Sequence, residues 1–340
     1  MVKRQLKYIA QTVMAPFAPL LWRARGEPRL LVLMYHRVLP PAHPDRAREQ
    51  PGMYVSPETL AMHLALLKRH FEIVHLDDWA ERVTNGQAVP RLACAVTFDD
   101  GWRDNFEHAF PILQELRVPA TIYLLPDLVG TQYQFWPNEL ARLLSDRRNE
   151  TVLRSWPEWL KQEVARVAGG ESVALPLSME KIDAVIERCK VLQTDSAMLE
   201  FLQGMRAQGN TPPDRDLMNW DEVRQMAASG WVRFGSHTRR HTRLDVRAAA
   251  EVLRDEICQS QVSLERELHR PISSFCYPNG DHCPAAVDLV RASYATAVTT
   301  HRGWNSVSSD RWLLNRVGVH EDISSTAPAF LARLSLAVGN

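Results

Sequence analysis

The sequence predicts an α/β fold built on a parallel sheet, with polar side chains gathered at one edge of that sheet. Short apolar runs alternate with helical patterns along most of the 340 residues, which is the rhythm of β–α–β units. Residues 30–35 are continuously apolar and residues 93–98 are apolar apart from Thr97, as expected of strands buried on both faces. The first run is followed by His36 and the second by Asp99 and Asp100, so both strands deliver ionisable residues.

The remaining elements follow from periodicity and from residues that start helices. Apolar runs predict further strands over residues 71–76, 120–125, 231–236, 272–276, 295–299 and 312–319. One helical pattern begins at residue 56. Further helical patterns cover residues 77–83, 104–117, 220–229, 248–268 and 284–294. Ser56 is expected to be the N-cap of the first helix, with Pro57 at its first position. Strand, helix and strand in close succession predict parallel pairing.

Residues 135–218 interrupt this rhythm with charged helical segments and a polar, proline-containing linker. We interpret them as a helical insertion rather than an independent domain, which either packs or forms a lid that selects substrate. The predicted organisation is a lead segment over residues 1–28 and a core domain in two parts, residues 29–134 and 219–340, on either side of the insertion.

The composition is that of an ordinary soluble protein. Its 40 basic residues balance 40 acidic ones, so we expect no nucleic-acid partner. Five cysteines without paired spacing favour a reducing compartment, and we therefore expect a cytoplasmic location. Cys276, His282 and Cys283 match no zinc spacing, and buried cysteine more often packs as a small apolar residue.

The first residues leave two alternatives open. Lys3, Arg4 and Lys7 precede an apolar stretch over residues 8–22, which is too short and interrupted to span a bilayer. It shows no convincing cleavage site. A packed lead segment is the simpler expectation, and an amphipathic helix at the inner face of a membrane, giving peripheral contact, is the alternative. The sequence does not indicate an oligomeric state.

Two motifs together suggest a metal site. His237 and His241 lie four residues apart, and on a helical turn this spacing places both imidazoles on one face. With one carboxylate they would supply three protein ligands and leave a divalent ion an open position for water. Asp99 and Asp100 resist joint ionisation unless a cation or hydrogen bonds compensate. Each motif alone also fits an ordinary structure, an Asx turn or a pair of surface histidines.

These motifs resemble those of the polysaccharide deacetylase family, the NodB-like carbohydrate esterases. Thr-Phe-Asp-Asp-Gly (97–101) resembles the first family motif, Ser-His-Thr-Arg-Arg-His (236–241) the second, and Phe-Cys-Tyr-Pro-Asn-Gly (275–280) a divergent third. The resemblance covers roughly residues 30–320 apart from the insertion. It implies a distorted (β/α) barrel of fewer than eight units, with the active site at the carboxyl ends of the strands.

The resemblance also implies an activity, the removal of an N-acetyl group from an amino sugar in a polysaccharide, oligosaccharide or glycolipid. Asp100, His237 and His241 would hold one divalent ion, zinc in first place and Co²⁺, Mn²⁺ or Ni²⁺ as alternatives. Asp99 would be the general base. The backbone of the third motif would bind the oxyanion, through residues Tyr277, Pro278 and Asn279.

Two roles depart from the usual family pattern. Cys276 stands where the family has an arginine that orients the base, and Arg316 in the last predicted strand is our candidate replacement, with a surface ion pair as the alternative. The usual late-motif proton donor would be His320. Residues 33–38, Leu-Met-Tyr-His-Arg-Val, resemble a branch in which the first strand supplies this histidine, which favours His36.

Two other functions remain open from the sequence. The same site could serve a deacylase or deformylase acting on a lipid-linked or nucleotide-linked sugar. A carbohydrate-binding protein with a decayed site is the third hypothesis, and Cys276 is the feature that favours it.

Overall fold

The computed structural model describes residues 26–150, 152–170, 173–193, 195–207 and 215–335, together with Pro19 and Trp22. The expectations for the lead segment, including its apolar stretch, fall almost entirely outside these residues. The chain divides into two compact units. The first comprises Met1–Leu39, Tyr54–Thr131 and Leu217–Asn340, and the second comprises Pro40–Met53 and Gln132–Asp216.

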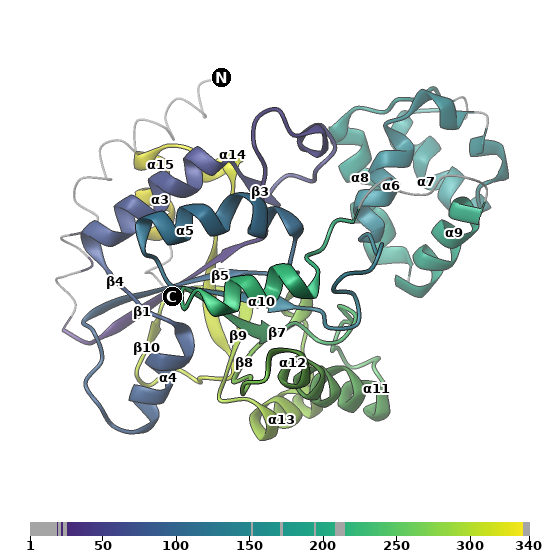
Figure 1. Ribbon diagram of the computed structural model, residues 1–340. Coiled ribbons are helices and arrows are strands. Elements are labelled where there is room, and N and C mark those ends of the chain that lie inside the picture. The colour runs from purple at the N-terminus through teal and green to yellow at the C-terminus, as the bar shows by residue number, and fades with distance from the viewer. Residues whose placement is uncertain are drawn as a thin grey trace. The chain divides into compact units, whose positions relative to one another are not determined.

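In the described part of the first unit, seven parallel strands close into a barrel (Figure 1). They are β1 (Arg29–Tyr35), β5 (Leu92–Phe98), β6 (Ala120–Leu124), β7 (Val232–Ser236), β8 (Ser274–Cys276), β9 (Thr296–Arg302) and β11 (Leu314–Gly318). Neighbours pair in the order β1–β5–β6–β7–β8–β9–β11, and β11 pairs with β1 to complete the ring. The predicted (β/α) barrel with fewer than eight units is confirmed.

The pairing of β1 with β5 sets the position of the first polar residues. The two strands run in register up to the pair Tyr35↔Phe98, and every residue of β5 is buried. The residues that follow them, His36 and Asp99, therefore emerge side by side at the carboxyl edge. The N–H of Asp99 donates to the Tyr35 carbonyl at 3.0 Å, which extends the pairing by one bond.

Short strands complete the sheets. β4 (Glu72–Ile73) pairs in parallel with β5, and β10 (Asn305–Ser306) pairs antiparallel with β1. β2 (Arg37–Val38) and β3 (Tyr54–Val55) form a separate two-stranded sheet. The strand expected over residues 71–76 is thus reduced to β4, because His75 already serves as the N-cap of the next helix.

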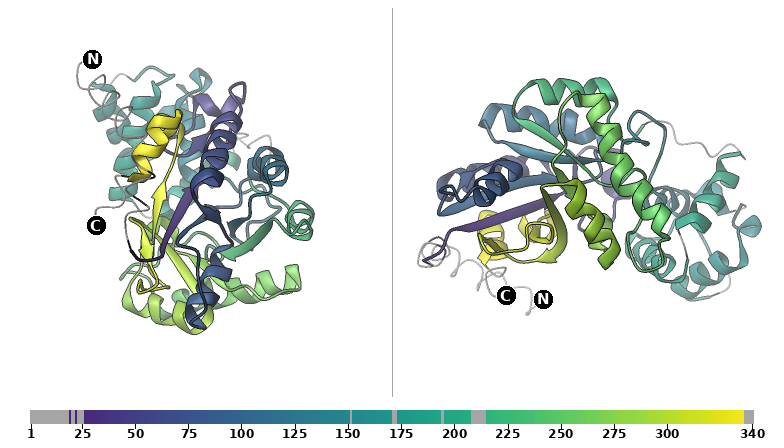
Figure 2. Two further views of the ribbon diagram at one scale, coloured as in Figure 1. Left: turned by 90° about the vertical axis from the view of Figure 1, so that its left-hand side faces the viewer. Right: turned by 90° about the horizontal axis from the view of Figure 1, so that it is seen from below.

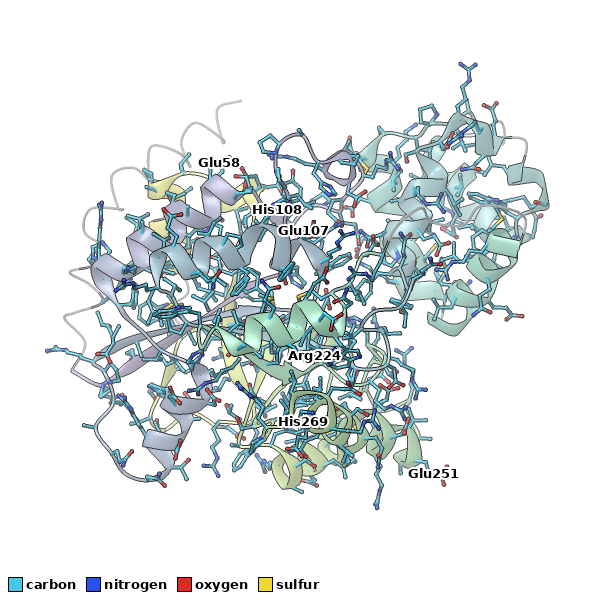
Figure 3. All side chains as sticks on the ribbon, viewed as in Figure 1. Glu58, Glu107, His108, Arg224, Glu251 and His269 are labelled. Atoms are coloured by element: carbon cyan, nitrogen blue, oxygen red, sulfur yellow. The ribbon has the colours of Figure 1, made fainter. Side chains whose placement is uncertain are left out.

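Helices surround the barrel, as Figures 1 and 2 show. They are α3 (Pro57–His70), α4 (Leu76–Thr84), α5 (Phe110–Leu116), α10 (Trp220–Ala228), α11 (Ala250–Arg254), α12 (Ser260–Leu268), α13 (Pro284–Ser293), α14 (Glu321–Ser324) and α15 (Ala327–Ser335). The predicted start of α3 is confirmed, since the Ser56 hydroxyl accepts the N–H of Thr59 at 3.2 Å. Exposed polar side chains occupy these helices and their ends, including Glu58, Arg224, Glu251 and His269 (Figure 3).

Two of the predicted helices contain a π-helical segment. η3 (Asn105–Ala109) precedes α5, and η6 (Asp255–Gln259) separates α11 from α12. The apolar periodicity predicts one continuous helix in each case, whereas the structure shows a π-helical turn within each. Turns of this kind are rare in proteins, but those that do occur are often found at functional sites.

The second unit is helical and has a hydrophobic core of its own. Its elements are α6 (Trp136–Leu144), α7 (Glu158–Ala168), α8 (Met179–Leu192), α9 (Asp195–Ala207) and the 3₁₀ turns η2 (Pro44–Ala47), η4 (Arg147–Glu150) and η5 (Val152–Ser155). Residues 40–53, which the predicted boundaries place in the core domain, group with these helices. Glu49 accepts from Asn138 and Gln50 donates to Asp183, each at 2.8 Å. These contacts join residues too distant in sequence for a local pattern to reveal.

Among the described residues, no helix combines the length and apolar character that crossing a bilayer requires.

A buried histidine supports the end of β1. His63 of α3 is fully buried, its Nε2 donates to the Ser324 carbonyl at 2.7 Å, and its Nδ1 accepts from the Tyr35 hydroxyl at 3.0 Å. The ring of Phe330 stacks on the imidazole at a centroid separation of 3.8 Å. Burial lowers the pKa of His63 from 6.5 to about 4, against the smaller effect of the Ser324 carbonyl.

We expect His63 to make the free energy of unfolding depend on pH. The pKa of His63 is lowered in the folded state, so its contribution is complete above pH 6.5 and is lost as the pH falls towards 4. Between pH 7 and pH 4.5 the loss from this group is about 2 kcal/mol. Urea unfolding of wild type and His63→Gln at both pH values measures it. The variant should lose about 2 kcal/mol less than wild type, and equal losses would contradict the assignment.

Candidate metal centre and active site

Side chains from several strands meet at the carboxyl edge of the barrel. β1 leads to His36, β5 to Asp99 and Asp100, and β7 to His237. After β5 the chain turns sharply, with φ of 73° at Asp100 and 71° at Gly101. The positive φ favours glycine at position 101, where a Cβ atom would also approach Leu124 Cδ2 to 2.6 Å.

Asp100, His237 and His241 direct ligand atoms towards one another. Their ligand atoms all lie within 4.8 Å, and Asp100 Oδ1 is 3.4 Å from His237 Nε2 and 3.5 Å from His241 Nε2. Atoms bound to zinc at about 2.0–2.1 Å in a tetrahedron stand about 3.4 Å apart. The spacing therefore fits a divalent ion.

The hydrogen bonds around this group leave the facing atoms available. The Trp102 indole donates to Asp100 Oδ2 at 3.0 Å, whereas Asp100 Oδ1 is buried and has no hydrogen-bond partner among the described residues. His237 Nδ1 lies 2.8 Å from the Cys276 carbonyl, to which it donates, so Nε2 faces Asp100. A backbone carbonyl that accepts from the far ring nitrogen is typical of histidines that bind metal. Two imidazole nitrogens and one carboxylate oxygen suit zinc and its neighbours in the first transition row.

The segment that joins His237 to His241 is a non-helical turn, so the prediction of a helical turn is wrong. Thr238, Arg239 and Arg240 form the turn between them. Thr238 and His241 adopt left-handed backbone, with φ of 67° and 64°. Such conformations cost about 1–3 kcal/mol each when the residue is not glycine. The turn brings the two imidazole centroids to 5.0 Å.

Asp99 forms a buried, bidentate pair with Arg316 of β11. Nη1 donates to Oδ1 at 2.7 Å and Nη2 donates to Oδ2 at 2.8 Å. The other three guanidinium donors reach the Thr299 carbonyl at 2.8 Å, Thr97 Oγ1 at 3.2 Å and Cys276 Sγ at 3.2 Å. Arg316 is 1% exposed, so the alternative of a surface ion pair is wrong. The guanidinium sits against the thiol of Cys276, at the motif position where the family pattern has arginine.

Nearby cations keep both carboxylates ionised. Burial raises the pKa of Asp99, but Arg316 outweighs it and holds the pKa below its usual range. Burial likewise raises the pKa of Asp100, yet His237 and His241 bring it well below the usual range. The pair can therefore hold two negative charges side by side, because each carboxylate faces compensating cations.

His237 carries the opposite shift. Burial lowers its pKa, but the neighbouring carboxylates of Asp100 and Asp99 raise the pKa well above its usual range. The imidazole ring must lose this proton before it can bind an ion, so metal binding at this site is coupled to proton release.

The two candidate proton donors differ in their surroundings. His36 Nε2 lies 3.9 Å from Asp99 Oδ2, with a side chain 21% exposed. Its carbonyl accepts from Asn105 Nδ2 at 2.8 Å, which anchors the loop. His320 Nδ1 is 3.1 Å from Asp322 Oδ2. Burial lowers the pKa of His320 and Asp322 opposes this shift only in part.

The third motif is expected to supply a backbone N–H for the oxyanion, and the structure narrows the three predicted residues to one candidate. The N–H of Tyr277 donates to the Val298 carbonyl at 3.2 Å, and Pro278 has no N–H. Asn279 is exposed, has left-handed backbone with φ of 55°, and its carbonyl accepts from Thr300 Oγ1 at 3.1 Å. Of the three predicted residues, Asn279 therefore remains the candidate.

Sequence reasoning missed the residues that hold these groups in place. Trp102 fixes Asp100, and Asp104 accepts from Arg37 Nε at 2.9 Å and from the Val38 N–H at 2.7 Å. The available signal was their position directly after the first motif.

The Cys276 side chain lies close to Asp99 and His237 in the described part of the chain. Burial raises the pKa of this thiol, so it stays protonated.

The sequence matches the family described as polysaccharide deacetylase over residues 86–163 and 193–298, more than half of the chain. The chain belongs to the polysaccharide deacetylase family. It is therefore a hydrolase that acts on carbon–nitrogen bonds other than peptide bonds. No curated protein matches its sequence significantly.

Solved structures show the same fold at low sequence identity. The deacetylase PplD of Streptococcus pyogenes, in complex with acetate, is 16% identical with a TM-score of 0.57, covering 91% of this chain and 99% of that one. BC0361, a polysaccharide deacetylase from Bacillus cereus, is 17% identical with a TM-score of 0.57, covering 90% and 69%. IcaB from Ammonifex degensii is 18% identical with a TM-score of 0.56, covering 91% and 97%.

Proposed function

We propose that this family member is a metal-dependent N-deacetylase acting on an amino sugar in a polysaccharide, oligosaccharide or glycolipid. One observation carries the proposal: the buried Oδ1 of Asp100, which has no hydrogen-bond partner among the described residues, faces Nε2 of His237 and of His241, beside a second carboxylate held by Arg316. We propose one divalent ion per site, zinc in first place, with Co²⁺, Mn²⁺ and Ni²⁺ as alternatives.

A divalent ion in this site would polarise the acetamide carbonyl and lower the pKa of a coordinated water. Asp99, which stays ionised, accepts the proton of the attacking water as general base. Arg316 holds both oxygens of Asp99 and so fixes the direction of the carboxylate. The N–H of Asn279 is our candidate donor to the oxyanion, where a backbone donor lowers the barrier.

Departure of the amine needs a proton, and we assign its delivery to His36. As the carbon–nitrogen bond breaks, the amine takes this proton and the acetyl group leaves as acetate. His36 lies 3.9 Å from Asp99, whereas His320 is paired with Asp322. The lowered pKa of His320 also leaves less of the protonated form that a general acid requires.

We predict that His36→Ala slows amide hydrolysis by about 10²–10⁴-fold but spares an activated acetyl ester, whose leaving group needs no proton. His320→Ala should affect both substrates mildly and alike. The amide-to-ester rate ratio of the two variants is the measurement. If the ratio collapses in His320→Ala and stays near wild type in His36→Ala, the assignment is reversed.

Acetate release tests the function directly. Purified protein, stripped with a chelator and reloaded with zinc, is incubated with N-acetylglucosamine oligomers and with N-acetylated glycolipids. We expect acetate from at least one amino-sugar substrate after reloading and none before it. Release of formate or a longer acyl acid would support the deacylase or deformylase hypothesis. Binding of oligomers without any hydrolysis would support a decayed site, although the Asp99–Arg316 pair speaks against decay.

We also propose a cytoplasmic location, with peripheral membrane contact through the lead segment as the alternative. All five cysteines are free, which agrees with a reducing compartment. Cell fractionation at low and high salt separates the two: recovery in the soluble fraction at both salt concentrations supports the first, and salt-dependent recovery with membranes supports the second.

A further inference from the structure

We propose that Glu256 is a positioning residue that holds the turn between His237 and His241 in the conformation needed to bind metal. This inference rests on the proposed metal site and extends it to a residue outside the family motifs.

A single carboxylate oxygen of Glu256 binds two backbone groups of the turn. Oε2 accepts the N–H of Arg239 at 2.9 Å and the N–H of Arg240 at 3.0 Å. Oε1 accepts from the Arg240 side chain, Nε, at 2.9 Å. Glu256 is 1% exposed. Bonds to an ionised acceptor are roughly twice as strong as neutral ones, so this clamp is a strong one.

The turn needs such a clamp because its backbone is strained. Thr238 and His241, which flank the two clamped residues, both have positive φ without being glycine. Residues in that conformation persist only where the surroundings impose it. Glu256 fixes the N–H groups of Arg239 and Arg240, which lie between these two strained residues. It therefore sets the orientation of the backbone at His241.

The helix that carries Glu256 supports the loop at its start as well. Ser260 Oγ lies 2.6 Å from Oγ of Ser236, the residue before His237. Glu256 belongs to the π-helical segment η6, and this kind of turn is frequent at functional sites. The deviation from regular helix therefore coincides with the residues that touch the histidine loop.

Asp255 provides a matched control within the same cluster. Its carboxylate binds the side chains of Arg239 and Arg240, at 2.5 Å and 2.6 Å. Removing it takes a negative charge from the same two arginines but leaves the backbone bonds to Glu256 in place. Comparing variants of Glu256 with variants of Asp255 thus distinguishes the effect of the backbone hydrogen bonds from the effect of removing a negative charge.

The experiment measures the dissociation constant of Zn²⁺ by competition with a chromophoric chelator, in wild type, Glu256→Ala, Glu256→Gln and Asp255→Ala. We expect Glu256→Ala to raise the constant by about 10–100-fold, the usual effect of losing a group that supports metal ligands. Glu256→Gln keeps an acceptor but not its charge, so we expect a rise of about 3–10-fold. Asp255→Ala should stay within about 2-fold of wild type, as expected of partly exposed ion pairs.

A spectroscopic measurement separates positioning from a general loss of structure. The visible absorption of Co²⁺ in Glu256→Ala should reach the wild-type spectrum at saturating Co²⁺, because the three ligands are intact. Unchanged Zn²⁺ affinity in Glu256→Ala, or an equal loss in Asp255→Ala, would overturn the proposal. If Glu256→Ala does not fold, Glu256→Gln against Asp255→Asn decides in the same way. Absence of Zn²⁺ binding in wild type would instead contradict the proposed function.

Discussion

Asp99→Asn should retain its metal ion and lose about 10²–10⁴-fold in the rate of deacetylation. The amide has nearly the shape of the carboxylate but cannot accept the proton of the attacking water. The three proposed ligands, Asp100, His237 and His241, are untouched by the change. Acetate release under saturating zinc, together with the metal content of the same preparation, gives both quantities.

Stability has to be checked in the same variant. Asp99→Asn removes the charge that faces Arg316, which is buried with all five donors engaged. Breaking a buried pair costs about 3–5 kcal/mol, so the variant should unfold at lower urea but remain folded in buffer. If Asp99→Asn loses its metal and regains activity in excess zinc, the two aspartates have exchanged roles.

Much of the barrel could be predicted because its signals are local. The strands β1 and β5 are buried on both faces. Such strands are recognisable in a sequence because apolar residues follow one another instead of alternating with polar ones. Parallel strands also place the residues that follow them at one edge, so the order of residues along the chain is enough to assign His36, Asp99 and His237 to one face. The motif resemblance then supplied their proposed roles.

The remaining features depend on contacts between distant residues. The pairing of Arg316 with Asp99 crosses the barrel interior, and nothing in the neighbourhood of Arg316 distinguishes it from an exposed arginine in a strand. The spacing of His237 and His241 fits a helix as well as a turn, and the turn is held by Glu256 from another element. The grouping of residues 40–53 with the helical unit likewise rests on long-range bonds.

The Asp100→Ala variant is expected to lose both metal and activity. It removes one of the three proposed protein ligands, the one whose Oδ1 is buried between two imidazoles. His237 and His241 alone cannot hold the ion, because structural and catalytic zinc sites use at least three protein ligands. Asp221→Ala is the matched control, since Asp221 is an exposed carboxylate at the start of α10.

The metal content of wild type, Asp100→Ala and Asp221→Ala after dialysis against one zinc-containing buffer tests the central claim most directly. We predict about one zinc ion per chain in wild type and in Asp221→Ala, and close to none in Asp100→Ala, with all three proteins folded. Full zinc occupancy in Asp100→Ala, or none in wild type, would contradict the assignment of Asp100, His237 and His241 as the metal centre.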